Sequence, residues 1–513
     1  MASIKLDGNT LTSTEISLVA KGEKVEVASD SWHKVQSSRA VVDRILSSGE
    51  TVYGINTGFG ALVSESISKD DLSALQVNLI RSHACGIGEL MSKEDTRAMM
   101  CVRANSLVKG NSGIQRKVIE QIINYLNHDI IPVVPRIGSL GASGDLAPLS
   151  HMALALIGEG QVWGENGPVE TPYALKENGL IPVDLKAKDG LSLINGTSQM
   201  CSFLSHADNI LSVLLPLADL VACVSMEARK CSIKPMDPRV HQVRPHEGQS
   251  LVAERITSIM ANSDILTSHT HCDRVQDAYS FRCIPQVHGA VLESYRKLSN
   301  TLDIEINSAT DNPLIFPNPK NPGEGEVVSQ GNFHGEILAL CADNMSHALF
   351  ELAHIAERRI DQIVDPSRSD LPPFLAKNSG LESGMMIVHY VAAAALAEMH
   401  GRASPRSAFS TPTSGGQEDH VSMGSTACWN LLETCRHLSQ VMACELLISC
   451  EALEYRTAEP ANHVKSLYSL VRKISKPLTK DRSTSEEIEL IAKELTNGGW
   501  LARIEAECGR LPR

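Results

Sequence analysis

The chain has 513 residues, of which 42% are hydrophobic and 21% charged, and this balance is that of a globular protein with room for a large core. Acidic residues outnumber basic ones by 60 to 47, and the net charge of −13 argues against a nucleic-acid partner. Aromatic residues make up only 4%, so the composition favours helices over sheets.

The N-terminus and the cysteines indicate where the protein works. The first residues, MASIKLDGNTL, lack the basic start and apolar run of a signal peptide. The most apolar segment, residues 209–226, is interrupted by Pro216 and Asp219, so it predicts a buried helix rather than a membrane span. Thirteen cysteines without a regular spacing indicate reduced thiols. We therefore expect a cytoplasmic protein with no membrane partner.

Helical patterns dominate the chain after about residue 190, whereas the first 130 residues mix short segments with glycine-rich turns such as TVYGINTGFGAL at 51–62. In residues 334–364, apolar side chains recur at steps of three and four or their multiples; these are Leu338, Met345, Leu349, Leu352, Ile355 and Ile360. Residues 385–401 and 427–456 show the same pattern. Helices this long and this apolar predict a mainly α fold, a long-helix bundle buried by neighbouring chains, with a smaller mixed N-terminal part.

We divide the chain into an N-terminal part, residues 1–225, and a helical-bundle part, residues 226–513, which together form one catalytic unit. No internal repeat, low-complexity tract or linker separates them in the sequence.

Three small residues, Ala142, Ser143 and Gly144, stand just before a predicted helix. The amide nitrogen of Gly144 can approach the carbonyl of Ala142 because glycine has no Cβ. Closing this five-membered ring with loss of two water molecules, one of them from the Ser143 side chain, would leave a methylidene group, a strong electrophile. The alternative is a plain turn that leads into Asp145 as an N-cap, with Pro148 in the first helical turn. The two readings are compatible, because the positive end of the helix dipole would make the methylidene group more electrophilic.

Residues 138–151, GSLGASGDLAPLSH, closely resemble the segment of the histidine and aromatic amino-acid ammonia-lyases that forms the methylidene-imidazolone (MIO) group. Five more segments resemble that family in the family's order: YGINTGFG (53–60), LINGTSQM (193–200), VQDAYSFRC (275–283), TDNPLIF (310–316) and GNFHGE (331–336). The resemblance covers nearly the whole chain. It implies the helical bundle of the ammonia-lyase (aspartase/fumarase-like) type, an MIO group formed from Ala142-Ser143-Gly144 without an external cofactor, and a homotetramer with sites shared between chains.

The resemblance also implies catalytic roles. The MIO electrophile takes the substrate amine as a covalent adduct, which makes ammonia a better leaving group. Tyr53 would remove the β-proton, and Tyr279 would assist proton transfer near the ring. Without the resemblance, Tyr53 would be read as a core tyrosine with a hydrogen-bonded hydroxyl.

Four further residues would bind the substrate. Asn195 resembles the family asparagine that lies beside the MIO group and the substrate carboxylate. Phe333 resembles the family phenylalanine that packs against the MIO ring. Gln276 and Arg282 stand three residues on either side of Tyr279, on one face of a predicted helical turn and a half, and Arg282 suits a carboxylate.

The sequence departs from the family near these residues. Ala278 replaces a usual proline, Phe281 a usual leucine and Gln330 a usual glycine, which puts only local geometry in doubt.

Two positions indicate the amino acid that is consumed. Ser82-His83 resembles the pair of the histidine-specific members, and Glu418 resembles their glutamate, where aromatic-specific members carry glutamine. A phenyl ring would leave both polar groups unpaired, at about 1–3 kcal/mol each. An acid at residue 418 could otherwise serve the first turn of a helix.

We therefore expect elimination of ammonia from L-histidine to trans-urocanate. The alternatives are a phenylalanine or tyrosine ammonia-lyase, an MIO aminomutase, or a helical scaffold that has lost its activity. His269, His271 and Cys272 resemble metal ligands but lack a second pair at zinc-finger spacing, so we expect structural roles and no metal. GINTGFG lacks the GxGxxG spacing of a nucleotide site.

Overall fold

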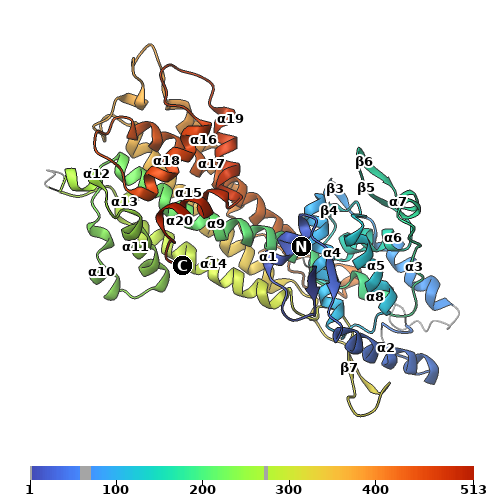
Figure 1. The fold of residues 1–513 in the computed structure, drawn as a ribbon. Helices are drawn as coiled ribbons and strands as arrows, with labels where there is room; N and C mark the ends of the chain where they lie inside the picture. The colour runs from blue at the N-terminus through green and yellow to red at the C-terminus, as the bar shows by residue number, and fades with distance from the viewer. Residues whose placement is uncertain (1–2, 53, 58–70, 271–274) are drawn as a thin grey trace. The chain divides into compact units, whose positions relative to one another are not determined.

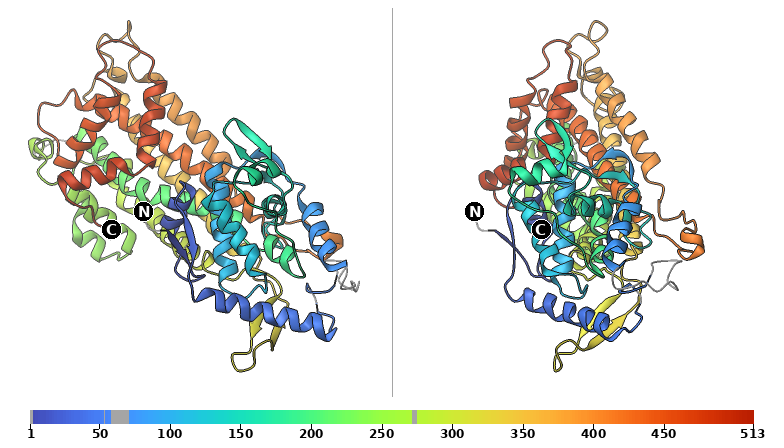
Figure 2. Two further views of the ribbon diagram at one scale, coloured as in Figure 1. Left: turned by 45° about the vertical axis from the view of Figure 1, so that its right-hand side comes forward. Right: turned by 90° about the vertical axis from the view of Figure 1, so that its right-hand side faces the viewer.

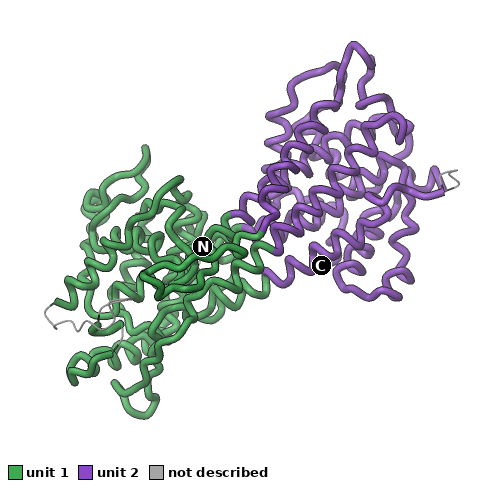
Figure 3. The backbone as a smooth tube through the Cα atoms, turned by 180° about the vertical axis from the view of Figure 1, so that it is seen from behind, with its two compact units in different colours: residues 1–206, 299–343, 405–429 green, residues 207–298, 344–404, 430–513 purple. Residues whose placement is uncertain are grey.

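The computed structural model describes residues 3–52, 54–57, 71–270 and 275–513. Helices make up most of it, and the strands pair only in twos, which confirms the mainly α fold (Figure 1). By their contacts the residues form two compact units of three segments each (Figure 3). Unit 1 comprises residues 1–206, 299–343 and 405–429, and unit 2 comprises 207–298, 344–404 and 430–513.

Four long helices begin in one unit and end in the other: α9 (Ser198–Ala228), α14 (Ile284–Glu305), α15 (Glu336–Val364) and α17 (Gly424–Leu453). Because each unit is built from three separate segments of the chain, the two units do not correspond to a single division of the sequence. The predicted division at residue 225 into parts of one catalytic unit stays a prediction.

Unit 1 carries the remaining N-terminal helices and every strand of the described residues. The helices are α1 (Ser13–Ala20), α2 (Ser31–Ser48), α3 (Leu72–His83), α4 (Lys93–Val108), α5 (Arg116–Asn127), α6 (Leu146–Leu156), α7 (Thr171–Glu177) and α8 (Asp189–Ile194). Strands β1 (Ile4–Leu6) and β2 (Val25–Val27) pair in parallel. The antiparallel pairs are β3 (Ile87–Leu90) with β4 (Pro135–Ile137), β5 (Gln161–Gly164) with β6 (Gly167–Glu170), and β7 (Leu314–Pro317) with β8 (Gly325–Val328).

The core of unit 1 forms around α4, in which every residue from Asp95 to Val108 is buried. Helices α1 and α5 pack against it. A smaller apolar cluster joins α2 to the β7–β8 hairpin, which lies beside that helix in both views of Figure 2. It contains Val41, Val42 and Ile315. The polar side chains of a helix that is buried on all faces must form hydrogen bonds inside the protein. Arg103 of α4 forms its hydrogen bonds at the site described below.

The described elements of unit 2 are helices. Besides the ends of the long helices it holds α10 (Pro238–Gln242), α11 (Glu247–Ile259), α12 (Asp264–Ser268), α13 (Tyr279–Arg282), α16 (Met386–Arg402), α18 (Asn462–Ile474), α19 (Ser485–Thr496) and α20 (Gly499–Cys508). Three short 3₁₀ turns complete the described elements: Lys234–Met236 and Pro373–Leu375 in unit 2, and Ser414–Gly416 in unit 1.

A buried polar network ties the long helices of unit 2 together. Asp219 of α9 accepts from Arg255 of α11, and its second oxygen lies 2.6 Å from Nδ1 of His288 of α14. Arg359 of α15 donates twice to Glu445 of α17, at 2.5 and 3.0 Å. Because a buried charge is destabilising unless it is paired, this network fixes which helices pack together.

The apolar segment predicted to be a buried helix is part of α9. It is the one helix of the described residues that is long and apolar enough to cross a membrane, and 78% of its most apolar window is buried within the structure. The helix continues through Pro216, and Asp219 is paired inside the core. A core helix accounts for this pattern. The twelve cysteines among the described residues all carry free thiols.

Candidate active site

The three residues Ala142, Ser143 and Gly144 lie in unit 1, directly before α6, where Ser143 is half-buried between two buried neighbours. Gly144 has a φ of +78° and forms a β-bridge with Gly196. A Cβ at Gly144 would lie 2.2 Å from the carbonyl oxygen of Gly196, so no other residue fits there without displacing the backbone. The amide of Asp145 donates to the same carbonyl at 2.7 Å. The tripeptide is therefore held by backbone contacts on its C-terminal side.

Asp145 is the N-cap residue of α6, as the turn reading predicted, and Pro148 lies in the first turn. The side chain of Asp145, however, makes no capping hydrogen bond to α6. It is fully buried and accepts hydrogen bonds from the amides of Gln199 and Met200, in the first turn of α9, and from the hydroxyl of Ser139 at 2.7 Å. Burial raises the pKa of Asp145 to about 6, against the lowering effect of these hydrogen bonds.

Asn195 ends α8 beside the tripeptide. Its Nδ2 donates to the carbonyl oxygen of Ser143 at 3.2 Å, whereas its Oδ1 is buried without a hydrogen-bond partner among the described residues. The backbone carbonyl of Asn195 accepts from Nη1 of Arg103 at 2.6 Å, and Nη2 of Arg103 donates to Ser192 at the same distance. Burial lowers the pKa of Arg103 to about 10. This buried arginine fixes the turn that presents Asn195 to the tripeptide.

Glu418 reaches the tripeptide from residues 413–423, more than 270 positions away in sequence. Its Oε1 accepts a hydrogen bond of 2.6 Å from Oγ of Ser143, and its Oε2 accepts one of 2.7 Å from Thr413. The backbones of Thr413 and Glu418 also form a β-bridge. Glu418 precedes α17, which starts at Gly424, so the interpretation as an acid in the first turn of a helix is wrong.

His83 is the last residue of α3 and is half-buried. Its Nδ1 lies 3.0 Å from Oγ of Ser82, which donates its proton to the carbonyl of Leu79. Because a hydroxyl has one proton, this arrangement leaves Nδ1 of His83 as the donor and Nε2 with the lone pair. Burial lowers the pKa of His83, and the carboxylate of Glu418 partly opposes that shift. His83 therefore lies near Glu418, the carboxylate that accepts the hydrogen bond of Ser143.

Phe333 lies in the turn before α15 and is half-buried. The turn is anchored to the residues just before the tripeptide, because the amide of Gly335 donates to the carbonyl of Gly141 at 3.0 Å. The hydroxyl of Ser422 donates to the same carbonyl, also at 3.0 Å. Both loops that carry predicted site residues, at 330–336 and 413–423, are thus fastened to Gly141.

The other three described site residues belong to unit 2 and contact one another there. Nη1 of Arg282 donates to Oε1 of Gln276 at 2.5 Å, and its guanidinium carbon lies 4.9 Å from the centre of the Tyr279 ring. The predicted shared helical face is wrong: α13 contains only Tyr279–Arg282, and Gln276 precedes it in a loop. The reason is the extended backbone at Ala278 and the carboxylate of Asp277, which accepts from the amide of Ser232 at 2.7 Å.

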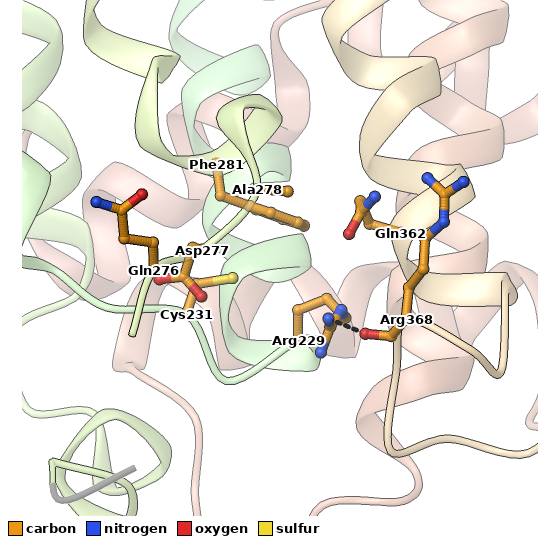
Figure 4. Close-up of a pocket in the computed structure, with 8 residues that line it drawn as sticks. All are labelled: Arg229, Cys231, Gln276, Asp277, Ala278, Phe281, Gln362 and Arg368. Carbon is orange, nitrogen blue, oxygen red and sulfur yellow. Dashed lines mark hydrogen bonds between the residues drawn. The ribbon is translucent and has the colours of Figure 1, made fainter. Parts of the chain in front are cut away.

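A cavity of about 330 Å³ in unit 2 is lined in part by this segment. Figure 4 shows its lining, in which Arg229 donates to the carbonyl of Arg368. Gln276, Asp277, Ala278 and Phe281 contribute from the predicted substrate segment, and Cys231, Gln362 and the two arginines complete it. Tyr279 and Arg282 do not line this cavity, and Tyr279 is 72% exposed.

Tyr53, the predicted base, lies outside the described residues, as do His271 and Cys272. The ring nitrogens of His269 face the backbone carbonyls of Ile265 and Cys231, at 2.6 and 3.2 Å. Such contacts suit the structural role predicted for His269.

Sequence reasoning missed the residues that support the tripeptide: Arg103, Ser139, Gly196 and Thr413. Glycine after Asn195 was the only available signal, since a glycine beside a predicted site residue often marks a close backbone approach. Arg103 gives no signal, because its partners are backbone carbonyls 89 and 92 residues away.

The residues around the tripeptide fit a peptide-derived prosthetic group. Gly144 lacks a Cβ where one would collide with the backbone, and Ser143 is the accessible member of the three. Oδ1 of Asn195 is a buried acceptor that has no hydrogen-bond partner in the part of the chain that the structure describes. A helical fold with a serine set in such a cradle agrees with the class that residues 138–151 resemble, the carbon–nitrogen lyases that eliminate ammonia.

Comparisons with known proteins agree with this class. The model of the aromatic amino acid lyase family matches residues 11–473, and the chain belongs to that family. It is 43% identical over 505 residues to a histidine ammonia-lyase of Myxococcus xanthus, with 98% of each chain covered. The crystal structure of histidine ammonia-lyase from Trypanosoma cruzi matches with a TM-score of 0.90 at 37% identity, over 99% of this chain and 96% of that one. A tyrosine aminomutase from Streptomyces globisporus matches with a TM-score of 0.93 at 35% identity, over the whole of both chains.

Proposed function

We propose that this protein is a histidine ammonia-lyase, which converts L-histidine to trans-urocanate and ammonia. The observation that carries the proposal is the hydrogen bond between Ser143 and Glu418, with His83 close enough for Glu418 to affect its pKa. The relatives that are 43% identical over nearly the whole chain and bear this name support it.

Ala142, Ser143 and Gly144 would form the MIO group, and no external cofactor is needed. The group would supply an electrophile that binds the substrate amine and so turns it into a better leaving group. Asn195 would hold the group through its amide, and its buried Oδ1 is available to accept a hydrogen bond from the substrate. The exclusion of any side chain at Gly144 supports this role, since the ring needs close approach of the backbone.

Glu418 and His83 would select the imidazole side chain. The carboxylate of Glu418 accepts from an imidazole N–H, and the lone pair on Nε2 of His83 is a second acceptor for a polar ring. A phenyl ring would leave both without a partner, at about 1–3 kcal/mol each. Glu418 also stands close enough to the tripeptide to share in proton removal.

The remaining roles rest on the family resemblance. Tyr53 would remove the β-proton of the substrate, and Tyr279 would assist this proton transfer. Arg282 and Gln276 would bind the substrate carboxylate. Phe333 would pack against the MIO ring.

We propose that neighbouring copies in a homotetramer supply some of these side chains. The strong exposure of Tyr279, and of Ile387 and Tyr390 on α16, at 55% and 63%, supports an assembly that covers them. The free thiols of the described cysteines support a cytoplasmic location.

An aminomutase or another aromatic ammonia-lyase is the second candidate, because the match to tyrosine aminomutase is as good as that to histidine ammonia-lyase. The fold therefore does not separate the two. Glu418 and His83 favour histidine over tyrosine or phenylalanine, and an inactive scaffold would not need the cradle around Gly144.

A substrate panel with ammonia measurement tests the proposal. Purified protein is given L-histidine, L-phenylalanine or L-tyrosine, and the conjugated acid is followed by ultraviolet absorbance while ammonia is counted. The proposal predicts urocanate and ammonia in equal amounts from histidine alone. Product from the aromatic substrates would contradict the role of Glu418 and His83, a β-amino acid without ammonia would reveal an aminomutase, and no turnover would contradict the enzyme.

A further inference from the structure

Three side chains in unit 1 that have no place in the proposed reaction lie close together: His334, Glu336 and His420. One ligand-type atom of each lies within 4.8 Å of the others. Nε2 of His420 is 3.6 Å from Oε2 of Glu336, and the two imidazole rings are stacked with centres 5.7 Å apart and planes within 9°. We propose that these three residues bind a divalent transition-metal ion, Zn²⁺ before others.

The kinds of ligand atom in this cluster indicate which metal it would bind. Two imidazole nitrogens and one carboxylate oxygen form a three-ligand zinc site that leaves the fourth position to water, whereas Mg²⁺ and Ca²⁺ prefer oxygen ligands alone. Zinc–ligand distances of about 2.0–2.2 Å place neighbouring ligands about 3.3 Å apart around a tetrahedral ion. The observed 3.6 Å between His420 and Glu336 is close to this value, so small side-chain rotations complete the site.

The free protein leaves one atom of this cluster unsatisfied. Oε2 of Glu336 is buried and has no hydrogen-bond partner among the described residues. A buried acceptor that lacks a hydrogen bond is unfavourable, and a cation would remove that penalty. An ordinary ion pair with His420 does not account for the cluster, because the His420 side chain is 66% accessible and exposed pairs contribute about 0–1 kcal/mol.

A ring nitrogen of His334 is already oriented by the protein. Its Nε2 lies 3.3 Å from the carbonyl oxygen of His420. Metal-binding histidines commonly donate one ring N–H to a carbonyl, which leaves the lone pair of the other nitrogen for the metal. The accessibility of His420, together with 36% for Glu336, gives an ion a path from solvent.

The backbone holds the ligands in place independently of a metal. His334 and Glu336 flank Gly335, whose amide is bound to Gly141, and His420 precedes Val421, whose amide donates to Ser410 at 3.1 Å. A bound ion would link the turn that carries Phe333 to the loop that carries Glu418, and so restrain both. Binding of the cation does not depend on which amino acid the enzyme consumes.

The test is a zinc titration of the full chain after removal of metals by a chelator, in competition with a chromophoric chelator. The expected result is one zinc ion per chain. His420→Ala and Glu336→Gln should each weaken its binding about tenfold or more, equivalent to at least about 1.4 kcal/mol. His347→Ala is the matched control, because His347 is exposed on α15 outside the cluster, and it should leave binding unchanged.

Cobalt substitution distinguishes this site from the cysteines. Co²⁺ on imidazole and carboxylate ligands gives visible ligand-field bands without the ultraviolet charge-transfer band of a cobalt thiolate. Zinc should also raise the unfolding midpoint of the wild type and of His347→Ala, but not that of His420→Ala. Absence of zinc binding, equal binding by wild type, Glu336→Gln and His420→Ala, or a thiolate band on the cobalt protein would each overturn the proposal.

Discussion

The hydroxyl of Ser143 donates a hydrogen bond of 2.6 Å to Oε1 of Glu418, across 275 positions of the sequence. The residue proposed to become the electrophile and the residue proposed to recognise the imidazole thus meet at one point. Thr413 fixes the other oxygen of Glu418 at 2.7 Å, so the carboxylate has a defined orientation toward the serine.

Replacement of Ser143 by alanine should abolish turnover of L-histidine, because the methylidene carbon comes from the serine side chain. Ser143 is half-buried, and among the described residues its hydroxyl donates to Glu418, so the variant should keep its fold, with an unfolding midpoint near that of the wild type. Initial rates from the absorbance of urocanate, with circular dichroism as the control of folding, check both expectations. Retention of wild-type activity by Ser143→Ala would remove the basis for the electrophile.

Glu418→Gln should lower kcat/KM for histidine by about 10- to 100-fold, which corresponds to the loss of a hydrogen bond to a charged group. The glutamine keeps the shape of the side chain and an oxygen for Ser143 or Thr413, so the free energy of unfolding should change by less than about 1 kcal/mol. The matched control is Asp419→Asn, a neighbouring exposed acid whose loss should leave kcat/KM unchanged. Equal activity of the wild type and Glu418→Gln would leave Glu418 with a structural role only.

Gly144→Ala should prevent both correct folding of the cradle and activity. Its Cβ would stand 2.2 Å from the Gly196 oxygen, and alanine at a φ of +78° adds backbone strain. We expect a loss of stability of about 2 kcal/mol or more, read from a denaturant midpoint, and no turnover. Gly401→Ala is the control, because a Cβ at Gly401 in α16 meets nothing within 4 Å. An active Gly144→Ala protein with wild-type stability would show that the backbone approach is not needed.

Asp145→Asn should change how stability depends on pH. The folded-state pKa of Asp145 is raised to about 6 from the ordinary 3.8, so the folded state binds the proton more tightly than the unfolded state. The resulting stabilisation is complete below about pH 4 and is lost as pH rises through about 6. The two pKa values correspond to about 3 kcal/mol.

The measurement for Asp145 is the difference in free energy of unfolding between wild type and Asp145→Asn, taken from pH 4 to pH 7. The wild type should lose stability relative to the variant as pH rises, by about 3 kcal/mol in total. A difference that stays constant with pH, or that changes in the opposite direction, would mean that Asp145 titrates at its ordinary pKa or below.

Local rules predicted much of the fold from sequence. The apolar spacing in residues 334–364 gave α15, which begins at Glu336 and ends at Val364, and the turn before Pro148 gave α6 with Asp145 as its N-cap. These features depend on residues within a few positions of one another, which a single sequence contains. Units 1 and 2 could not be predicted in this way, because the long helices pass from one unit to the other.

The predictions from sequence failed where a contact with a residue distant in the sequence determines the local structure. The spacing of Gln276 and Arg282 predicts a shared helical face, but the contact of Asp277 with Ser232 holds the preceding segment extended. Asp145 has the local signature of a helix cap, yet its side chain caps α9, more than 50 residues later. His334 and His420 lie 86 positions apart, so their cluster has no motif. Competition between local propensity and such tertiary contacts is invisible without the fold.

The conversion of the tripeptide is the centre of this account, and the mass of the protein tests it most directly. Intact-protein mass spectrometry, with fragmentation of the peptide that contains residues 142–144, is carried out on wild type and Ser143→Ala. The account predicts that the wild type is lighter than its sequence by two water molecules, with the loss confined to these residues, and that Ser143→Ala lacks the methylidene. A wild-type protein that has the full mass of its sequence and still converts histidine to urocanate would contradict it.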